Sequence, residues 1–298
     1  MKQKIKEVLH KIIRLLIQPL FDEYLVALSR QDQILLSLKY RELVQTQDKG
    51  LDFEQVGFNL YSPTYEDGIL LYIFSLIGTT NKKCVDIGAG SVKGSTVANL
   101  IVNHGFKGLL IDGNSQSIQL VKKYYANHPE TRFSPPQAVS AMITAENVNE
   151  LLNEYGYVGN IDLLCLDIDG MDYWILKAID VVSPQVLVVE YQDILGPDKA
   201  WTVPYKPDFN LQDYPVNRKE NNYCGASLSA FVSLCKHKGY RLVGCNKGGW
   251  NAFFVREGVC EAFLPEVTPE SCFKYEWNRY GMEKRFPLVM NMEWEEVC

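Results

Sequence analysis

The 298-residue chain lacks several features that would assign it to a class directly. None of its eight cysteines forms a C-x-x-C pair, so the ligand spacing of a structural zinc site is missing. No basic block offsets the net charge of −6, which argues against nucleic acid as the main partner. Histidine is scarce. The four histidines, at positions 10, 104, 128 and 237, fall in polar helix ends or loops, which disfavours a histidine general base.

Long apolar runs are also missing from the N-terminal region. The apolar stretch from Ile12 to Ile17 is interrupted by Arg14 and closed by Pro19, far short of the roughly 20 residues that span a bilayer. No small-residue cleavage site follows, so we do not expect a signal peptide. Residues 1–18 have the pattern of a basic amphipathic helix. We expect it to dock on the main domain or on a second copy of the chain, with contact to an anionic membrane surface as the alternative.

The composition that is present indicates one main domain with appendages. A chain with 47% hydrophobic residues can bury a sizeable core. We expect a helical segment over residues 1–50 for docking or oligomerisation, a main domain over residues 51–256, and an aromatic extension over residues 257–298 that packs on it. Three cysteines, Cys84, Cys165 and Cys245, fall in predicted buried strands, as reduced thiols do, and this predicts a cytoplasmic protein.

From residue 51 onward, predicted strands and helices alternate. This pattern is typical of a doubly wound, Rossmann-like α/β fold with a mostly parallel sheet. The last two predicted strands, Tyr240–Cys245 and Asn251–Arg256, are joined by only five residues. A linker of that length makes a hairpin and cannot make a parallel crossover. We therefore predict a seven-stranded sheet with a terminal antiparallel hairpin strand, preceded by N-terminal helices.

A glycine-rich turn follows the first strand of this domain. The segment KKCVDIGAGSVKG carries Gly88, Gly90 and Gly94, and glycines at such a turn let the backbone lie against a nucleotide-like ligand. The next strand ends in Asp112, which lies 18 residues after Gly94 and is placed to accept hydrogen bonds from ribose hydroxyls, with Asn114 beside it. This combination indicates an adenosyl cofactor.

The charge of Asp86 bears on which adenosyl cofactor this is. Asp86 stands two residues before the first glycine, where a carboxylate would repel the pyrophosphate of NAD. A carboxylate suits the sulfonium and ammonium groups of S-adenosylmethionine, so this cofactor is favoured over NAD. The alternative is that Asp86 only caps the following turn. A sheet with an antiparallel last strand also favours S-adenosylmethionine, because dinucleotide dehydrogenase sheets stay parallel.

At this point the chain resembles a known family. The segments that carry the resemblance, over roughly residues 60–256, are EDGILLYIF, VDIGAGSVKG, GLLIDGN, ENVNELL, DLLCLDIDGMDYWIL, VLVVEY, GASLSAFVSLCKHKGYRLVGC and NAFFV. They resemble class I S-adenosylmethionine-dependent methyltransferases, and within that class the FkbM-type enzymes of bacterial surface-polysaccharide and natural-product pathways. The resemblance implies methyl transfer to a hydroxyl of a sugar-like acceptor.

Three acids follow the fourth and fifth strands and are the candidate catalytic residues. Asp167, Asp169 and Glu190 fall at strand carboxyl ends, which face the ligand crevice in such sheets. We expect Asp169 or Asp167 to serve as general base or acceptor anchor. Alternatively, the three carboxylates hold Mg²⁺ or Mn²⁺. Asp172 is expected to cap the helix that it begins.

The acceptor is expected to bind the long irregular segment Gln192–Cys224, which has the length of a functional loop. Its aromatic side chains suit stacking on a sugar ring, free or nucleotide-linked; they are Trp201, Tyr205, Tyr214 and Tyr223. Covering an exposed sheet edge is the alternative role. Two other functions stay open for the whole chain: an NAD(P)-dependent oxidoreductase and a catalytically silent binding or scaffold relative.

Overall fold

The computed structural model describes residues 29–220 and 222–297. The amphipathic segment expected over residues 1–18 lies outside the described residues. The helical segment expected over residues 1–50 is described from residue 29, and residues 29–46 are helical.

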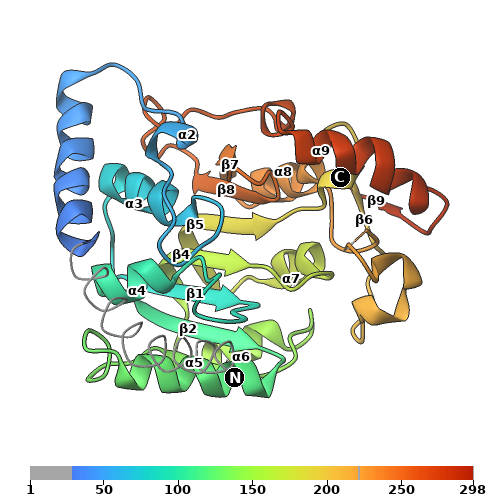
Figure 1. Ribbon diagram of the computed structural model, residues 1–298, viewed down its shortest axis with the longest axis horizontal. Coiled ribbons are helices and arrows are strands. Elements are labelled where there is room, and N and C mark those ends of the chain that lie inside the picture. Colours follow the sequence, from blue (N-terminus) through green and yellow to red (C-terminus); the bar gives the residue numbers. More distant parts are fainter. Residues whose placement is uncertain (1–28, 221, 298) are drawn as a thin grey trace, which may run out of the picture.

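A seven-stranded sheet forms the centre of the molecule, as predicted (Figure 1). Its strands are β1 (Lys83–Ile87), β2 (Lys107–Asp112), β3 (Gln137–Ser140), β4 (Gly159–Leu166), β5 (Val182–Glu190), β7 (Tyr240–Cys245) and β8 (Asn251–Arg256). Their spatial order is β3-β2-β1-β4-β5-β8-β7. The first five strands pair in parallel, whereas β8 runs antiparallel to both of its neighbours. The antiparallel strand therefore sits inside the sheet, between β5 and the edge strand β7.

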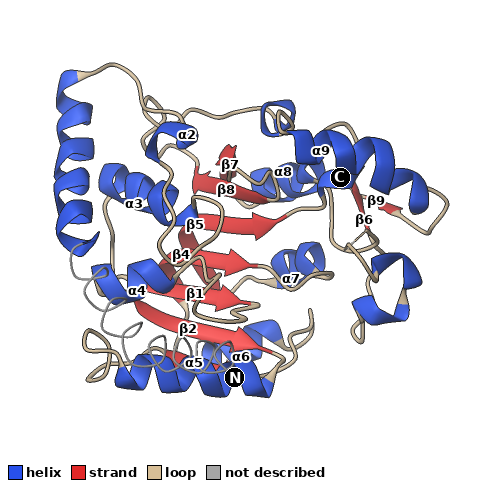
Figure 2. Cartoon of the chain, in the orientation of Figure 1, coloured by secondary structure: helices blue, strands red, loops and turns tan. Residues whose placement is uncertain are grey.

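Helices cover both faces of this sheet (Figure 2). They are α3 (Glu66–Ile77), α4 (Ala98–His104) and α5 (Ser115–Asn127) on one face, and α6 (Val148–Glu154), α7 (Asp172–Ala178) and α8 (Leu228–His237) on the other. Strand side chains alternate between the two cores: Val186 and Val188 pack with the first group of helices, Leu187 and Val189 with the second. Burial on both faces explains why β5 is almost wholly apolar.

The predicted hairpin between β7 and β8 is confirmed. Asn246 closes it, because its side-chain oxygen accepts hydrogen bonds from the backbone N–H groups of Gly249, Trp250 and Asn251. One asparagine side chain therefore satisfies three donors of the turn and fixes where β8 begins.

Two element boundaries shape the surroundings of the strand ends. Strand β3 ends at Ser140, and the next three residues leave the sheet and line a cavity. Helix α4 begins only at Ala98. The Ser95 hydroxyl accepts a hydrogen bond from the backbone N–H of Val97 and donates one to Asp86, which holds this part of the chain in a loop.

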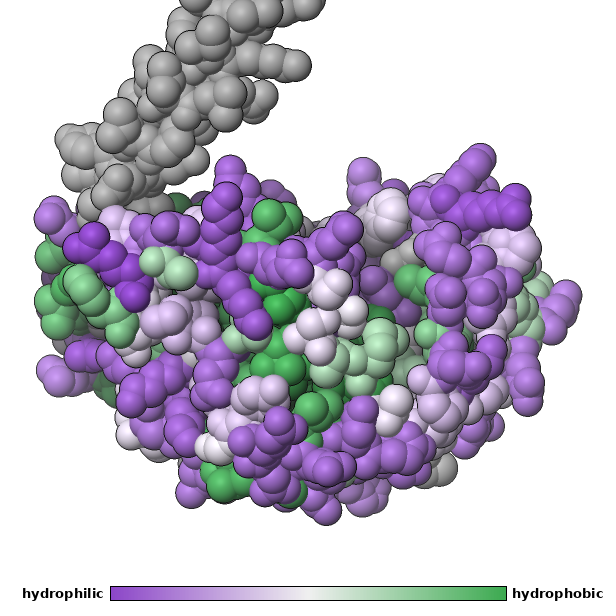
Figure 3. Space-filling view, turned by 90° about the horizontal axis from the view of Figure 1, so that it is seen from below, coloured by the Kyte–Doolittle hydropathy of each residue, from purple (hydrophilic) through white to green (hydrophobic). Residues whose placement is uncertain are grey.

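The segment after β8 folds back beside the carboxyl ends of the strands (Figure 1). It contains α9 (Glu276–Tyr280) and a short strand, β9 (Glu295–Glu296), which pairs antiparallel with β6 (Trp201–Thr202). A further small helix, α2 (Phe53–Val56), precedes α3. Among the described helices none is long and apolar enough to cross a membrane. The face shown in Figure 3 is mostly hydrophilic, with an apolar band across its middle.

Candidate active site

The glycine turn after β1 lies directly against the end of β4. The backbone N–H groups of Gly88 and Ala89 donate to the carbonyl of Ile111, at 2.9 and 3.1 Å. Gly88 has a φ of 90°, and a Cβ atom added there would lie 1.6 Å from the carbonyl oxygen of Asp167. Only glycine fits this position, since both the left-handed backbone and the close approach exclude a side chain.

Asp112 faces a cavity of about 440 Å³, called cavity A here, at the end of β2. Its carboxylate accepts hydrogen bonds from the backbone N–H groups of Gly90, at 2.7 Å, and Asn114, at 2.6 Å. Each carboxylate oxygen has more than one acceptor position, so Asp112 retains capacity for ribose hydroxyls. Asn114 also lines cavity A, but its side-chain oxygen caps α5 by accepting from Gln116 and Ser117.

Asp86 lines a second cavity, cavity B, of about 230 Å³. The side chain is only 4% exposed, and among the described residues its carboxylate accepts from the Ser95 hydroxyl at 3.3 Å rather than from the glycine turn. Desolvation, together with the nearby charge of Asp112, raises the pKa of Asp86 to about 7. A positively charged ligand stabilises the ionised form of a buried acid such as Asp86.

The three expected acids meet at the carboxyl ends of β4 and β5. Ligand atoms of Asp167, Asp169 and Glu190 all lie within 4.8 Å of one another. Register explains this grouping: Leu166 pairs with Val189, so Asp167 comes level with Glu190, the next residue of β5. The alternation of side chains places both on the sheet face that carries Asp86.

Asp167 and Glu190 form a hydrogen-bonded pair of carboxyl groups. The side chain of Asp167 is exposed where it lines the cavities. The surrounding protein nevertheless desolvates its carboxylate, and this desolvation, with the charges of Asp172 and Asp169, raises the pKa of Asp167 to about 7. Desolvation, followed by the charges of Asp167 and Asp169, raises the pKa of Glu190 well above its usual range. The hydrogen bond between the two carboxyl groups raises the pKa of Glu190 and lowers that of Asp167, so Glu190 holds its proton more tightly than Asp167 does.

The turn after β4 is shaped by Asp172. Its buried carboxylate accepts from the backbone N–H groups of Ile168, at 2.8 Å, and Gly170, at 2.9 Å, which is a structural role. The turn holds Asp169 in the left-handed region, with φ of 56°. Non-glycine residues adopt this region rarely, and it clusters at functional sites. Here it sets Asp169 at the boundary between cavity A and a third cavity.

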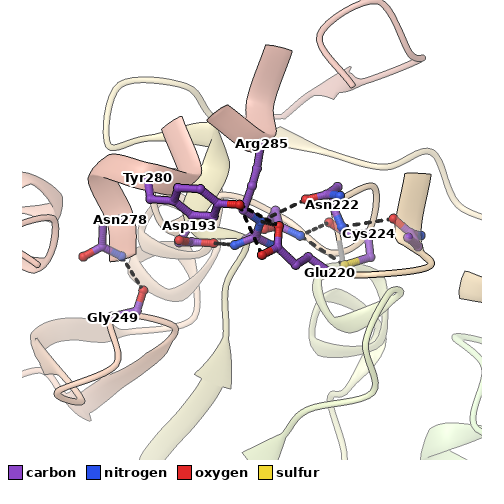
Figure 4. A network of polar contacts seen from close by, with 10 residues as sticks. Asp193, Glu220, Asn222, Cys224, Gly249, Asn278, Tyr280 and Arg285 are labelled. Carbon is purple, nitrogen blue, oxygen red and sulfur yellow. Dashed lines mark hydrogen bonds and ion pairs between the residues drawn. The ribbon is translucent and has the colours of Figure 1, made fainter. Parts of the chain in front are cut away.

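This third cavity, cavity C, has a volume of about 400 Å³ and is walled partly by the C-terminal segment. Arg285 anchors that wall (Figure 4): it donates to Asp193 Oδ1 at 3.2 Å and to Asn222 Oδ1 at 2.9 Å, and it lies 3.5 Å from Glu220. Asn278 ties the same segment to the β7–β8 hairpin through the carbonyl of Gly249, at 2.9 Å. Arg285 and Asp193 are both buried, and the ion pair between them compensates both charges.

The aromatic residues that line cavity C are not the ones expected from the sequence. Trp250 and Trp277 line it, from the hairpin and from α9. The four expected aromatics are engaged in packing instead, in ring contacts of Trp201 with Phe286, Tyr205 with Trp174, Tyr214 with Phe209 and Tyr223 with Trp294. The segment Gln192–Cys224 still contributes to cavity C, but through polar residues such as Gln192 and Lys219.

The three cavities are joined at the acid cluster. Cavities A and B share Gly88, Gly90 and Asp167, and cavities A and C share Asp169. Among the described residues, no histidine lines these cavities. One extended ligand can therefore occupy A and B while a second molecule enters C and meets it beside Asp169.

No protein-family model and no curated protein matches the chain. Among solved structures it is similar to TnmH (TM-score 0.36, 13% identity, 78% of this chain and 59% of that one). It is also similar to a candidate caffeoyl-CoA O-methyltransferase from Staphylococcus aureus (0.42, 13%, 80% and 99%) and to the mitomycin 7-O-methyltransferase MmcR (0.37, 12%, 74% and 67%). The chain thus spans about three fifths of the length of TnmH. Likenesses of this size assign no activity or substrate to the chain.

Proposed function

We propose that this chain transfers a methyl group from S-adenosylmethionine to a hydroxyl of a sugar-like acceptor. The observation that carries the proposal is the meeting of the three cavities at the acid cluster, where Asp167 lines cavities A and B and Asp169 lines cavities A and C. Asp112, the proposed ribose partner, lines cavity A, and the buried acid Asp86 lines cavity B. The resemblance to FkbM-type enzymes supports an acceptor from a bacterial surface polysaccharide or natural product.

An NAD(P)-dependent oxidoreductase fits this site less well. A pyrophosphate against the glycine turn would have to approach Asp86 and Asp167 in cavity B, two acids that a polyanion destabilises. The methionine end of S-adenosylmethionine carries a sulfonium and an ammonium, which these acids attract, and one carboxylate, so this end has a net positive charge where a pyrophosphate is negative.

Cavity C supports a neutral, hydroxyl-rich acceptor. Acidic side chains outnumber basic ones along its wall: Asp169, Asp172, Glu190, Asp193 and Glu220 against Lys219 and Arg285. Arg285 is already neutralised by Asp193 and Glu220. A phosphate group would therefore meet a net negative field, whereas carboxylates accept hydrogen bonds from sugar hydroxyls and Trp250 or Trp277 offers a flat apolar surface. If the acceptor sugar is linked to a nucleotide, only the sugar would enter cavity C.

The protein has to align the acceptor hydroxyl with the methyl group of the cofactor and to remove the hydroxyl proton. S-adenosylmethionine, when bound, supplies an activated methyl group. Asp112 and Asp86 would hold its two ends, and Asp169 would anchor the acceptor at the junction of cavities A and C. Asp167 would take the proton of the acceptor hydroxyl, because a pKa of about 7 makes it an effective base near neutral pH. Glu190 tunes Asp167 through their shared hydrogen bond.

Metal-assisted transfer is a second candidate, favoured by the 4.8 Å grouping of the three carboxylates. Mg²⁺ or Mn²⁺ held by Asp167, Asp169 and Glu190 would lower the pKa of the acceptor hydroxyl. Methyl transfer that survives EDTA supports the base; loss with EDTA and recovery with Mg²⁺ or Mn²⁺ supports the metal.

Calorimetry and a methyl-transfer assay test the proposal together. The protein should bind S-adenosylhomocysteine in the micromolar range and should not bind NAD. Labelled methyl should then appear on a neutral glycoside from an acceptor panel that also contains sugar phosphates. Binding of NAD without S-adenosylhomocysteine would overturn the proposal. Binding of S-adenosylhomocysteine with no transfer to any panel member, or to cell-extract glycans, would favour a silent relative.

A further inference from the structure

Asn251, the first residue of β8, carries a buried polar atom without a partner. Its side chain is 6% exposed and lines cavity B, and its Oδ1 has no hydrogen-bond partner among the described residues. A buried carbonyl oxygen left without a donor keeps its full desolvation penalty. An unpaired acceptor at a cavity wall therefore indicates that a ligand supplies the donor.

The orientation of the Asn251 amide is set by Glu66. The Nδ2 group of Asn251 donates to Glu66 Oε1 at 3.1 Å. Because that oxygen accepts, the amide nitrogen must face Glu66, and the amide oxygen is turned away from it. Thr64 and Asn246 also donate to Glu66, which itself is only 1% exposed, so this orienting group is fixed in place.

Register brings Asn251 to the acid cluster. Asn251 pairs with Glu190 across β5 and β8, and the two side chains lie on the same face of the sheet. Cavity B then has acceptor groups from separate strands, Asp86 on β1 and Asn251 on β8, with Asp167 after β4. A compact group with several N–H donors and a positive charge matches this set of acceptors.

We propose that Asn251 Oδ1 accepts a hydrogen bond from the α-ammonium of the adenosyl cofactor in cavity B, and that Glu66 is the positioning residue that aims it. This inference rests on the proposed function and adds to it the group that reads the amino-acid end of the cofactor. It assigns a binding role to the β7–β8 hairpin as well as a structural one.

The wild-type protein provides the first test. S-adenosylhomocysteine is compared by calorimetry with its des-amino analogue, which keeps the adenosine, the thioether and the carboxylate. We expect the des-amino analogue to bind at least about tenfold more weakly, the scale of a hydrogen bond to a charged group. Equal affinity for the two ligands would overturn the inference while leaving the proposed function intact. Failure to bind either ligand would instead overturn the proposed function.

The Asn251→Ala variant locates the effect. It should lose about tenfold or more in affinity for S-adenosylhomocysteine and keep wild-type affinity for the des-amino analogue. Asn103→Ala is the matched control, because Asn103 is also a buried asparagine with an unpartnered Oδ1 but lines none of the three cavities. It should bind both ligands as the wild type does. An Asn251→Ala protein that binds S-adenosylhomocysteine normally, or loses both ligands equally, would contradict the role of Asn251.

Discussion

The pairing of Asp167 with Glu190 gives different roles in proton transfer to two carboxyl groups that are chemically alike. Desolvation beside other acids raises the pKa of Glu190 well above its usual range, and the pKa of Asp167 is about 7. A single hydrogen bond between neighbouring strands thus produces one donor and one base.

Replacing Asp167 tests this assignment. Asp167→Asn should lower turnover by about a hundredfold or more, the usual scale for general-base catalysis, with cofactor affinity kept. In the wild type, kcat/KM should rise with pH up to about 7, since Asp167 must lose its proton to act as the base. That rise should be absent from the residual activity of the variant.

Asp169→Asn is the comparison variant. As an acceptor anchor, Asp169 should affect KM for the acceptor more than kcat, and the pH profile should stay. A hundredfold loss of kcat in Asp169→Asn, with Asp167→Asn nearly normal, would exchange the two roles.

Asp112 and Asn114 are neighbours in sequence with different expected effects. Asp112→Ala should weaken S-adenosylhomocysteine binding by about 1.5–3 kcal/mol, because a charge-assisted hydrogen bond to the ribose is lost. Asn114→Ala should mainly lower the free energy of unfolding, by about 1 kcal/mol, because it removes the cap of α5. Calorimetry and chemical denaturation of both variants distinguish the two cases; unchanged affinity in Asp112→Ala would point to another ribose partner.

The sequence predicted the site residues that follow a strand in register and missed those that depend on tertiary packing. The sequence could predict that Asp112, Asp167 and Glu190 lie together, because the carboxyl ends of parallel strands share one edge of the sheet. Asn251 begins the antiparallel strand, so its presence at the same edge follows only from the position of β8 next to β5. Trp277 reaches cavity C through irregular structure after β8, for which no periodic pattern exists.

At the scale of elements, the glycine turn joins β1 to the end of β4. Gly88→Ala should destabilise the protein by about 3 kcal/mol or more, because the new Cβ atom meets the carbonyl oxygen of Asp167 and that backbone cannot yield cheaply. Gly105→Ala is the matched control. Gly105 has φ of 68° with nothing within 4 Å of an added Cβ, so only the left-handed strain of about 1–2 kcal/mol applies.

Thermal or denaturant unfolding of both variants, with calorimetry for the cofactor, checks this expectation. Gly88→Ala should also lose cofactor binding, since the turn forms part of cavities A and B. Equal destabilisation by the two substitutions would mean that the contact with β4 is relieved by a small shift.

The hairpin and the C-terminal segment differ in how far the sequence could predict them. Five residues between two strands leave only one geometry, so the antiparallel β8 was predictable from length alone. The path of residues 257–297 is set by buried side-chain contacts such as Arg285 with Asp193. The sequence alone therefore does not predict that this segment packs beside cavity C.

For the whole molecule, several buried acids give an unusual dependence of stability on pH. Desolvation raises the pKa of Asp86 to about 7 and those of Asp67, Asp172 and Asp193 to about 6, from an ordinary value of 3.8. Below pH 4 both the folded and the unfolded chain hold these protons, and the folded state has their full contribution. As the pH rises from about 4 to 7, the unfolded chain releases them first, so these groups lower the free energy of unfolding.

Asp86→Asn measures one part of this effect. At pH 8, without cofactor, the variant should be more stable than the wild type by up to about 4 kcal/mol, the equivalent of a pKa shift of about three units. The gain should vanish at pH 4, and S-adenosylhomocysteine binding should weaken. Denaturant unfolding at both pH values is the measurement. A variant that is less stable at pH 8 would show that the ionised Asp86 is well compensated without a ligand.

The position of β8 has a consequence for how the chain matures during synthesis. A ribosome releases β5 more than 60 residues before β8, so a strand that is apolar on both faces emerges as an open sheet edge. The edge strand β7 emerges earlier than β8 but has no sheet partner until β8 arrives between them. Nascent chains halted before residue 251 should therefore recruit chaperones at β5, and release from them should coincide with emergence of the hairpin.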